Sequence, residues 1–228
     1  DDPAASHRHC VDATFTLLLA ARDEGIIRFV YAASSAAYGD TPTLPKVETM
    51  RPSPMSPYAV GKLTGEYYCS VFSQVFGLET ISLRYFNVFG PHQDPKSQYS
   101  AAIPAFVTSI LKVEPPTIYG DGEQSRDFTY IDNVVEANLL AARAKKTSGQ
   151  VVNIACGQAV TVNEIISLIN KSLNKNVKPI YTDPRPGDVK HSLADIPAAA
   201  NLIGFKPVVS FEEGLQKAIG WYSKNSEK

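Results

Sequence analysis

A run of apolar and small residues at positions 26–33, interrupted only by Arg28, constrains the fold of this chain more than any other segment. A run without polar alternation predicts a strand that is buried on both faces, as in a parallel sheet. The run ends in Ser34 and Ser35, and a second buried strand is predicted over residues 80–86. Because ligands of open α/β sheets bind beyond the carboxyl ends of the strands, a serine hydroxyl at this point could bond a reacting oxygen.

A tyrosine and a lysine four residues apart, Tyr58 and Lys62, follow a helix-start signal. Ser56 suits the N-cap and Pro57 the first helical position, so both side chains should project from one face of the first turns. An ammonium near a phenol favours the phenolate, and we expect Lys62 to lower the pKa of Tyr58 from its usual value of about 10. Such a tyrosine exchanges a proton with a sugar or alcohol hydroxyl near neutral pH.

Strand and helix signals alternate along the rest of the chain, which predicts an α/β fold with a parallel sheet. Short strands are expected over residues 117–119 and 151–155, and a long surface loop over residues 40–57. Capping boxes begin at Thr161 and Ser210. The expected helices cover residues 5–24, 58–76, 101–112 and 132–145, the last of them capped by Asp132.

The overall properties of the 228 residues exclude several classes of function. A net charge of −1 gives no electrostatic reason to expect a nucleic acid or a membrane as partner, and no apolar run is long enough to span a bilayer. The cysteines Cys10, Cys69 and Cys156 form no Cys-x-x-Cys pair, so no metal site and no disulfide framework is expected. We therefore expect a globular protein whose thiols are buried in a reducing cytosol.

Four motifs in order resemble the extended short-chain dehydrogenase/reductase family, and within it the nucleotide-sugar 4-epimerases. They are Ser34 with Tyr58 and Lys62, then the segments 84–91, 119–128 and 185–188. The resemblance implies a partial Rossmann-type, doubly wound parallel sheet with a smaller C-terminal substrate-binding α/β domain. It implies that residues 1–90 are the C-terminal part of an NAD-binding domain and that residues 91–228 are mainly a substrate domain, with residues 132–156 returning to the first.

The glycine-rich fingerprint of dinucleotide-binding folds does not occur among the 228 residues. The chain begins with Asp1, and its whole length resembles the middle and end of an epimerase. We therefore expect a truncated chain that lacks the first βαβαβ half of the nucleotide domain, and whose own activity is in question.

The resemblance also implies chemistry: NAD is held tightly, and C4 of a UDP-hexose is oxidised and then reduced on the opposite face. In this scheme Tyr58 is the acid/base, Lys62 bonds the nicotinamide ribose, and Ser34 bonds the substrate near O4. Further cofactor contacts fall at Ala32 and Tyr85. The implied substrate contacts are Ser35, Asn87, Ala101, Ala102, Phe106, Arg126, Arg185, Asp188 and Ser192. The family often dimerises through the helix that bears the tyrosine, which predicts a homodimer for the full-length protein.

Two details narrow the expected substrate. Related dehydratases and decarboxylases usually carry an acidic residue after the catalytic serine or threonine, whereas Ser35 follows Ser34 here. This difference favours simple oxidation and return at C4. A bulky tyrosine at the position of Ser192 restricts the family's site to glucose and galactose, so the small serine predicts UDP-GlcNAc and UDP-GalNAc as substrates, as in polysaccharide biosynthesis.

The sequence departs from the family pattern at one motif, and three other functions are compatible with it. Cys10 and Ala13 stand where the family commonly has Asn-x-x-Gly, so contacts to the cofactor region are expected to differ there. The chain could instead be a UDP-glucose/UDP-galactose 4-epimerase, or another nucleotide-sugar-modifying member such as a dehydratase or reductase. The third alternative is a non-catalytic fragment that binds UDP-sugar through Arg126 and Arg185 without NAD.

Overall fold

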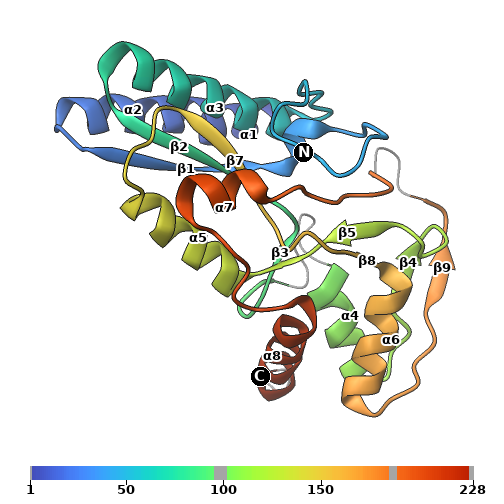
Figure 1. The fold of residues 1–228 in the computed structure, drawn as a ribbon. Coiled ribbons are helices and arrows are strands. Elements are labelled where there is room, and N and C mark those ends of the chain that lie inside the picture. Colours follow the sequence, from blue (N-terminus) through green and yellow to red (C-terminus); the bar gives the residue numbers. More distant parts are fainter. Residues whose placement is uncertain (1, 95–101, 185–188, 226–228) are drawn as a thin grey trace.

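A computed structural model provides the structure of the chain and describes residues 2–94, 102–184 and 189–225. Three predicted substrate contacts, Ala101, Arg185 and Asp188, lie outside the described residues. Figure 1 shows an upper region built on a parallel sheet and a lower region of helices and short strands. In the part of the chain that is described, no helix is both long and apolar enough to cross a membrane.

The upper region is organised around three parallel strands in the order β1-β2-β7. They span Arg28–Ser34 (β1), Glu79–Tyr85 (β2) and Gln150–Ile154 (β7). Central β2 is buried over residues 80–84, whereas β1 at the edge of the three is partly exposed. The predicted α/β fold with a parallel sheet is confirmed. The first strand begins two residues later than expected, because Ile26 and Ile27 lie exposed in the connection that follows Gly25.

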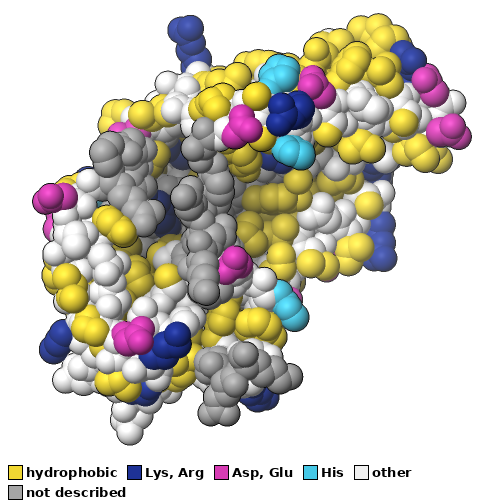
Figure 2. All heavy atoms as spheres, turned by 180° about the vertical axis from the view of Figure 1, so that it is seen from behind, with side chains coloured by type: hydrophobic (Ala, Val, Ile, Leu, Met, Phe, Trp, Pro, Cys, Tyr) yellow, Lys and Arg dark blue, Asp and Glu magenta, His cyan; other side chains and the backbone are white. Residues whose placement is uncertain are grey.

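One face of the sheet is covered by helices from the first part of the chain. Helix α1 (Pro3–His7), a π-helical segment η1 (Arg8–Asp12) and α2 (Ala13–Asp23) follow one another and pack with α3 (Pro57–Phe76). As the sequence predicts, the Ser56 side chain caps α3 by accepting from the backbone N–H of Ala59 at 3.1 Å, and Gly77 ends it in the left-handed conformation. Viewed from behind, hydrophobic side chains gather over this upper region (Figure 2).

The close contact between η1 and α3 depends on a glycine. A Cβ atom added at Gly61 would lie 2.7 Å from the Cβ of Cys10, a distance that real Cβ contacts essentially never show. Gly61 therefore brings Cys10 within packing distance of the first turns of α3, beside Tyr58 and Lys62.

The other face of the sheet is covered by α5 (Ile131–Arg143) and α7 (Pro197–Ile203), which pack on Ile81 and Leu83. The prediction that Asp132 caps α5 is wrong. The N-cap position is held by Tyr130, whose side chain makes no capping bond. Asp132 lies in the first turn and accepts from Lys217 at 3.1 Å.

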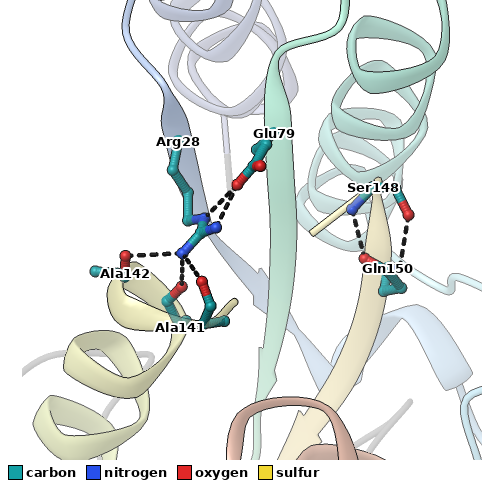
Figure 3. A network of polar contacts seen from close by, with 7 residues as sticks. Arg28, Glu79, Ala141, Ala142, Ser148 and Gln150 are labelled. Carbon is teal, nitrogen blue, oxygen red and sulfur yellow. Dashed lines mark hydrogen bonds and ion pairs between the residues drawn. The ribbon is translucent and has the colours of Figure 1, made fainter. Parts of the chain in front are cut away.

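Arg28 joins the sheet to the end of α5, as Figure 3 shows. Its guanidinium pairs with Glu79 on β2 and donates to the carbonyls of Ala141 and Ala142 at 3.3 and 2.9 Å. The last carbonyls of a helix have no partner within the helix, so a cation there satisfies them.

The lower region surrounds a second hydrophobic core between α4 (Ala102–Leu111), α6 (Val162–Leu173) and α8 (Phe211–Asn225). Both predicted capping boxes are formed, Thr161 with Glu164 and Ser210 with Glu213. Three pairs of short strands complete the region: β3 (Val88–Phe89) with β6 (Thr129–Tyr130), β4 (Thr117–Tyr119) with β9 (Ile180–Thr182), and β5 (Ser125–Asp127) with β8 (Ala159–Thr161).

Candidate functional site

A cavity of about 860 Å³ opens at the carboxyl ends of β1 and β2, where parallel α/β sheets bind their ligands. It is lined by the N-terminal helices, by the 3₁₀ segment η2 (Ser35–Tyr38) that follows β1, and by the start of α3. Residues that follow β2, together with β5 and the segment 189–192, complete the lining. The predicted site residues found in its wall are Ser34, Ser35, Tyr58, Tyr85, Asn87, Arg126 and Ser192.

Ser34 and Tyr58 meet at the upper end of the site. Ser34 ends β1 opposite Tyr85 on β2, and its hydroxyl is hydrogen-bonded to the phenol of Tyr58. The Ser34 Oγ atom also accepts from the backbone N–H of Ala36 at 3.2 Å. Tyr58 is 36% exposed. This arrangement brings two hydroxyl groups to one place in the cavity wall, as a proton transfer to or from a sugar hydroxyl requires.

Lys62 lies one turn beyond Tyr58 but points its ammonium at the sheet. The Nζ atom donates to the carbonyl of Ala32 at 2.8 Å and lies 5.9 Å from the centre of the Tyr58 ring. Ala32 on the partly exposed strand β1 therefore acts as the acceptor that orients the lysine. Burial lowers the pKa of Lys62 below its usual range.

The prediction that Lys62 lowers the pKa of Tyr58 is wrong for this structure. Burial raises the pKa of Tyr58 above its usual value of 10.0, and the bond from Ser34 opposes that rise. The ammonium donates to the Ala32 carbonyl and lies 5.9 Å from the centre of the Tyr58 ring. Tyr58 is thus a neutral phenol at pH 7, and the group that favours its ionisation is Ser34.

The other end of the cavity carries amide and guanidinium groups. Asn87 has a φ of 31° and donates from Nδ2 to the backbone carbonyl of Asp127 at 3.0 Å. Arg126 donates from Nη1 to the carbonyls of Ser125 and Lys190, both at 3.0 Å. The Arg126 side chain is therefore oriented by two backbone segments in the cavity wall.

A backbone hydrogen bond holds Ser192 in place, and a side-chain hydrogen bond holds Tyr85. The Ser192 N–H donates to the carbonyl of Ser125 at 3.0 Å, which joins the segment 189–192 to β5. The Tyr85 hydroxyl donates to Oδ1 of Asn138 on α5 at 3.0 Å. Burial raises the pKa of Tyr85, so this side chain also remains a neutral phenol at pH 7.

Two predicted substrate contacts do not line this cavity. Phe106 is only 6% exposed and packs within the core of the lower region, among residues of α4, α6 and α8. Ala102 begins α4 and packs against the same core. Both positions are apolar residues on a helix whose buried face is directed at that core.

Several residues of the cavity wall were not predicted from the sequence, among them Tyr38 and Lys46. Tyr38 is 1% exposed, and its hydroxyl donates to Oδ1 of Asn153 at 2.7 Å. Lys46, from the long loop before α3, is 2% exposed and donates from Nζ to Thr41. A lysine within a polar loop carries no local signal of burial. Cys10, predicted as a departure from the family pattern, is buried and lines the cavity.

Comparison with protein-family models gives a match over residues 1–155 to the NAD dependent epimerase/dehydratase family. A putative UDP-glucose 4-epimerase of Methanocaldococcus jannaschii is 36% identical over 214 residues, which cover 93% of this chain and 68% of the relative.

Solved structures give close matches as well. The UDP-N-acetylglucosamine 4-epimerase of Methanobrevibacter ruminantium, in complex with UDP-N-acetylmuramic acid, is 41% identical with a TM-score of 0.94, covering 98% of this chain and 72% of that one. The UDP-glucuronic acid 4-epimerase of Bacillus cereus, in complex with UDP-glucuronic acid and NAD, is 33% identical with a TM-score of 0.87, covering 95% and 68%. The three relatives are named for three different sugars.

Proposed function

The chain belongs to the NAD-dependent epimerase/dehydratase family, and we propose that its site catalyses NAD-dependent 4-epimerisation of a UDP-sugar, with UDP-GlcNAc and UDP-GalNAc as the substrate pair. The observation that carries this proposal is a single cavity lined both by Ser34 and Tyr58 and by Arg126 and Ser192. A proton-transfer pair and a phosphate-binding side chain are the two elements that a nucleotide-sugar epimerase needs in one site.

The residues at the upper end of the site fit the nicotinamide half of NAD. A lysine ammonium carries three donors, and the bond to Ala32 uses one of them, so Lys62 has N–H groups to offer to ribose hydroxyls. Tyr85 and the small residue Ala33 are in the cavity wall nearby, at the ends of β2 and β1. When bound, NAD supplies the hydride acceptor and donor for the sugar carbon C4.

In the proposed mechanism Tyr58 moves the proton of the sugar 4-hydroxyl. The phenolate oxygen accepts that proton when C4 is oxidised, and the phenol returns it when C4 is reduced on the opposite face. Because burial raises the pKa of Tyr58, the phenolate needs stabilisation, and the Ser34 hydroxyl supplies it by hydrogen bonding. Ser34 is therefore proposed as the residue that both holds the substrate oxygen and favours the reactive form of Tyr58.

Arg126 is proposed to bind the diphosphate, because a guanidinium forms two parallel hydrogen bonds with phosphate oxygens. Its bonds to the carbonyls of Ser125 and Lys190 orient it before substrate arrives. Asn87, Ser35 and Ser192 offer amide and hydroxyl groups for the sugar in the same cavity wall.

The preference for N-acetylated sugars is proposed from the small size of Ser192, which leaves room beside the sugar, and is supported by the 41% identity to a UDP-N-acetylglucosamine 4-epimerase. The direct experiment compares the rates at which the chain with NAD epimerises UDP-GlcNAc, UDP-glucose and UDP-glucuronic acid. We expect the highest kcat/KM with UDP-GlcNAc and no net formation of NADH. A higher kcat/KM with either other sugar would contradict the substrate assignment, and net NADH formation would contradict epimerisation.

A homodimer is proposed through the apolar face of α2 and α3. Large hydrophobic side chains that are about half exposed or more lie along both helices: Leu17, Val60, Tyr67, Val71, Val75 and Phe76. An apolar surface of this kind on two adjacent helices is typical of a protein interface. Sedimentation velocity should give the mass of a dimer for the chain and of a monomer for Val71→Asp, with Val135→Asp on α5 as the control. A monomeric wild-type chain would contradict the proposal.

A further inference from the structure

Asp127, the last residue of β5, is a fully buried carboxylate whose partners are backbone N–H groups. Its Oδ1 atom accepts from the N–H of Cys156 at 2.9 Å. Its Oδ2 atom accepts from the N–H of Gly157 at 3.0 Å and from that of Ala194 at 3.2 Å. No ion pair in the described part of the chain involves this carboxylate.

These contacts join segments that are far apart in the sequence. Cys156 and Gly157 form the turn that follows β7 of the central sheet, whereas Ala194 lies two residues after Ser192 of the cavity wall. The main-chain carbonyl of Asp127 accepts from Nδ2 of Asn87 at 3.0 Å. One residue thus connects the central sheet with the segments that carry Asn87 and Ser192.

A carboxylate without a cationic partner is a costly group to bury. Burial raises the pKa of Asp127 to about 6, although four backbone N–H groups oppose that rise. The charged groups nearest in sequence to these contacts are Arg126 on β5 and Asp195 next to Ala194, and the thiol of Cys156 lies on the turn. At pH 7 the ionised form, with its oxygens accepting only, suits the surrounding donors.

We propose that Asp127 is a positioning residue for the nucleotide-sugar end of the cavity, whose carboxylate holds the Ser192 segment and the Cys156 turn in a fixed relation to Asn87 and Arg126. This inference rests on the proposed function, since it takes a UDP-sugar as the ligand of that end. Substrate affinity therefore depends on Asp127, whereas proton transfer at Ser34 and Tyr58 does not.

The test is the isosteric variant Asp127→Asn, which keeps the shape of the side chain but turns one acceptor oxygen into a donor that faces backbone N–H groups. Loss of a buried hydrogen bond of this kind is expected to weaken binding of UDP, measured by calorimetric titration, by about tenfold or more. The KM for UDP-GlcNAc should rise by a similar factor, while kcat stays within about twofold.

Thr80→Val is the matched control. Thr80 is also fully buried, and its Oγ1 atom donates to the carbonyl of Cys69 at 2.7 Å. The exchange likewise removes a buried hydrogen bond, but neither Thr80 nor Cys69 lines the cavity. The control should lose stability without a change in the Kd for UDP.

An unchanged Kd in Asp127→Asn, or an equal loss in both variants, would overturn the inference. If Asp127→Asn does not fold, Asp127→Glu retains the charge and tests the same prediction. If neither folds, Asp127 has a general structural role and the inference is overturned. A wild-type chain that binds neither UDP nor UDP-GlcNAc would instead refute the proposed function itself, and with it the inference.

Discussion

The carboxylate of Glu66 on α3 and the guanidinium of Arg84 on β2 form a bidentate ion pair, with N–O distances of 2.9 and 2.7 Å. The two side chains are only 3% and 4% exposed. Glu66 lies one turn beyond Lys62, and the Arg84 guanidinium lies 4.6 Å from the centre of the Tyr38 ring. The pair therefore ties the helix that carries Tyr58 to the strand and to the segment that follows Ser34.

Breaking this pair on one side should destabilise the fold. Glu66→Gln leaves a buried guanidinium charge without its partner, which costs about 3–5 kcal/mol of unfolding free energy. Asp132→Asn breaks the pair with Lys217, whose side chains are about half exposed, and should cost less than about 1 kcal/mol. Urea denaturation measures both. Similar losses in the two variants would contradict the role given to burial.

Tyr58→Phe should abolish epimerisation while leaving UDP binding intact. Removal of an acid/base group lowers kcat by about 10²–10⁴-fold, and the phenyl ring preserves the packing of α3. Tyr67→Phe, at a 58% exposed tyrosine of the same helix, serves as the control and should change kcat less than about twofold. A Tyr58→Phe variant with wild-type kcat would remove Tyr58 from the mechanism.

Ser192→Tyr should narrow the range of substrates. A bulky ring in the cavity wall removes the space proposed for the N-acetyl group, so kcat/KM for UDP-GalNAc should fall about tenfold or more. The kcat/KM for UDP-galactose should change much less. Ser35→Thr, a smaller enlargement in the same wall, is the control for general crowding. Equal losses with both sugars would show that Ser192 has no part in this discrimination.

Asp127 should make the unfolding free energy of the chain fall as the pH rises from 4 to 6. Its pKa is about 6 in the folded chain against a usual value of 3.8, so the folded state binds more protons than the unfolded state between these values. The contribution of Asp127 to stability is thus fully present below pH 4 and declines as the pH rises to 6. A rise of this size in the pKa corresponds to about 3 kcal/mol.

The measurement compares wild type with Asp127→Asn by urea denaturation between pH 4 and pH 7. Other carboxylates titrate in both proteins, so the difference in unfolding free energy isolates Asp127. As the pH rises, the unfolding free energy of the wild type should fall relative to that of Asp127→Asn. A constant difference would show that the pKa of Asp127 is not raised.

Gly61→Ala should loosen the contact between η1 and α3. The added Cβ would meet the Cβ of Cys10 at 2.7 Å, and an overpacked contact of this kind costs about 1–3 kcal/mol. Gly220→Ala on α8 is the matched control, because nothing lies within 4 Å of its new Cβ atom. That control should gain about 0.5–1 kcal/mol from helix propensity, so a loss of stability there would contradict the reasoning.

Local patterns in the sequence were sufficient for most of the secondary structure. The apolar runs of β1 and β2, the cap at Ser56 and the stop at Gly77 depend on neighbours within a few residues, and all are found in the structure. The failure at Asp132 has a tertiary cause, since its carboxylate bonds Lys217 on another helix instead of capping its own.

The functional site likewise has features that the sequence predicted and features that only the tertiary structure decided. The resemblance of the sequence motifs to those of nucleotide-sugar epimerases indicated that Ser34, Tyr58, Asn87, Arg126 and Ser192 belong together, and the structure brings them to one cavity. Only the tertiary structure decided that Phe106 is a core residue, that Lys62 bonds the Ala32 carbonyl, and that burial raises the pKa of Tyr58. Packing of segments decides which groups are buried and which distant parts of the chain come close together. Both burial and proximity determine the energy of a charged group, so neither could be predicted from the sequence alone.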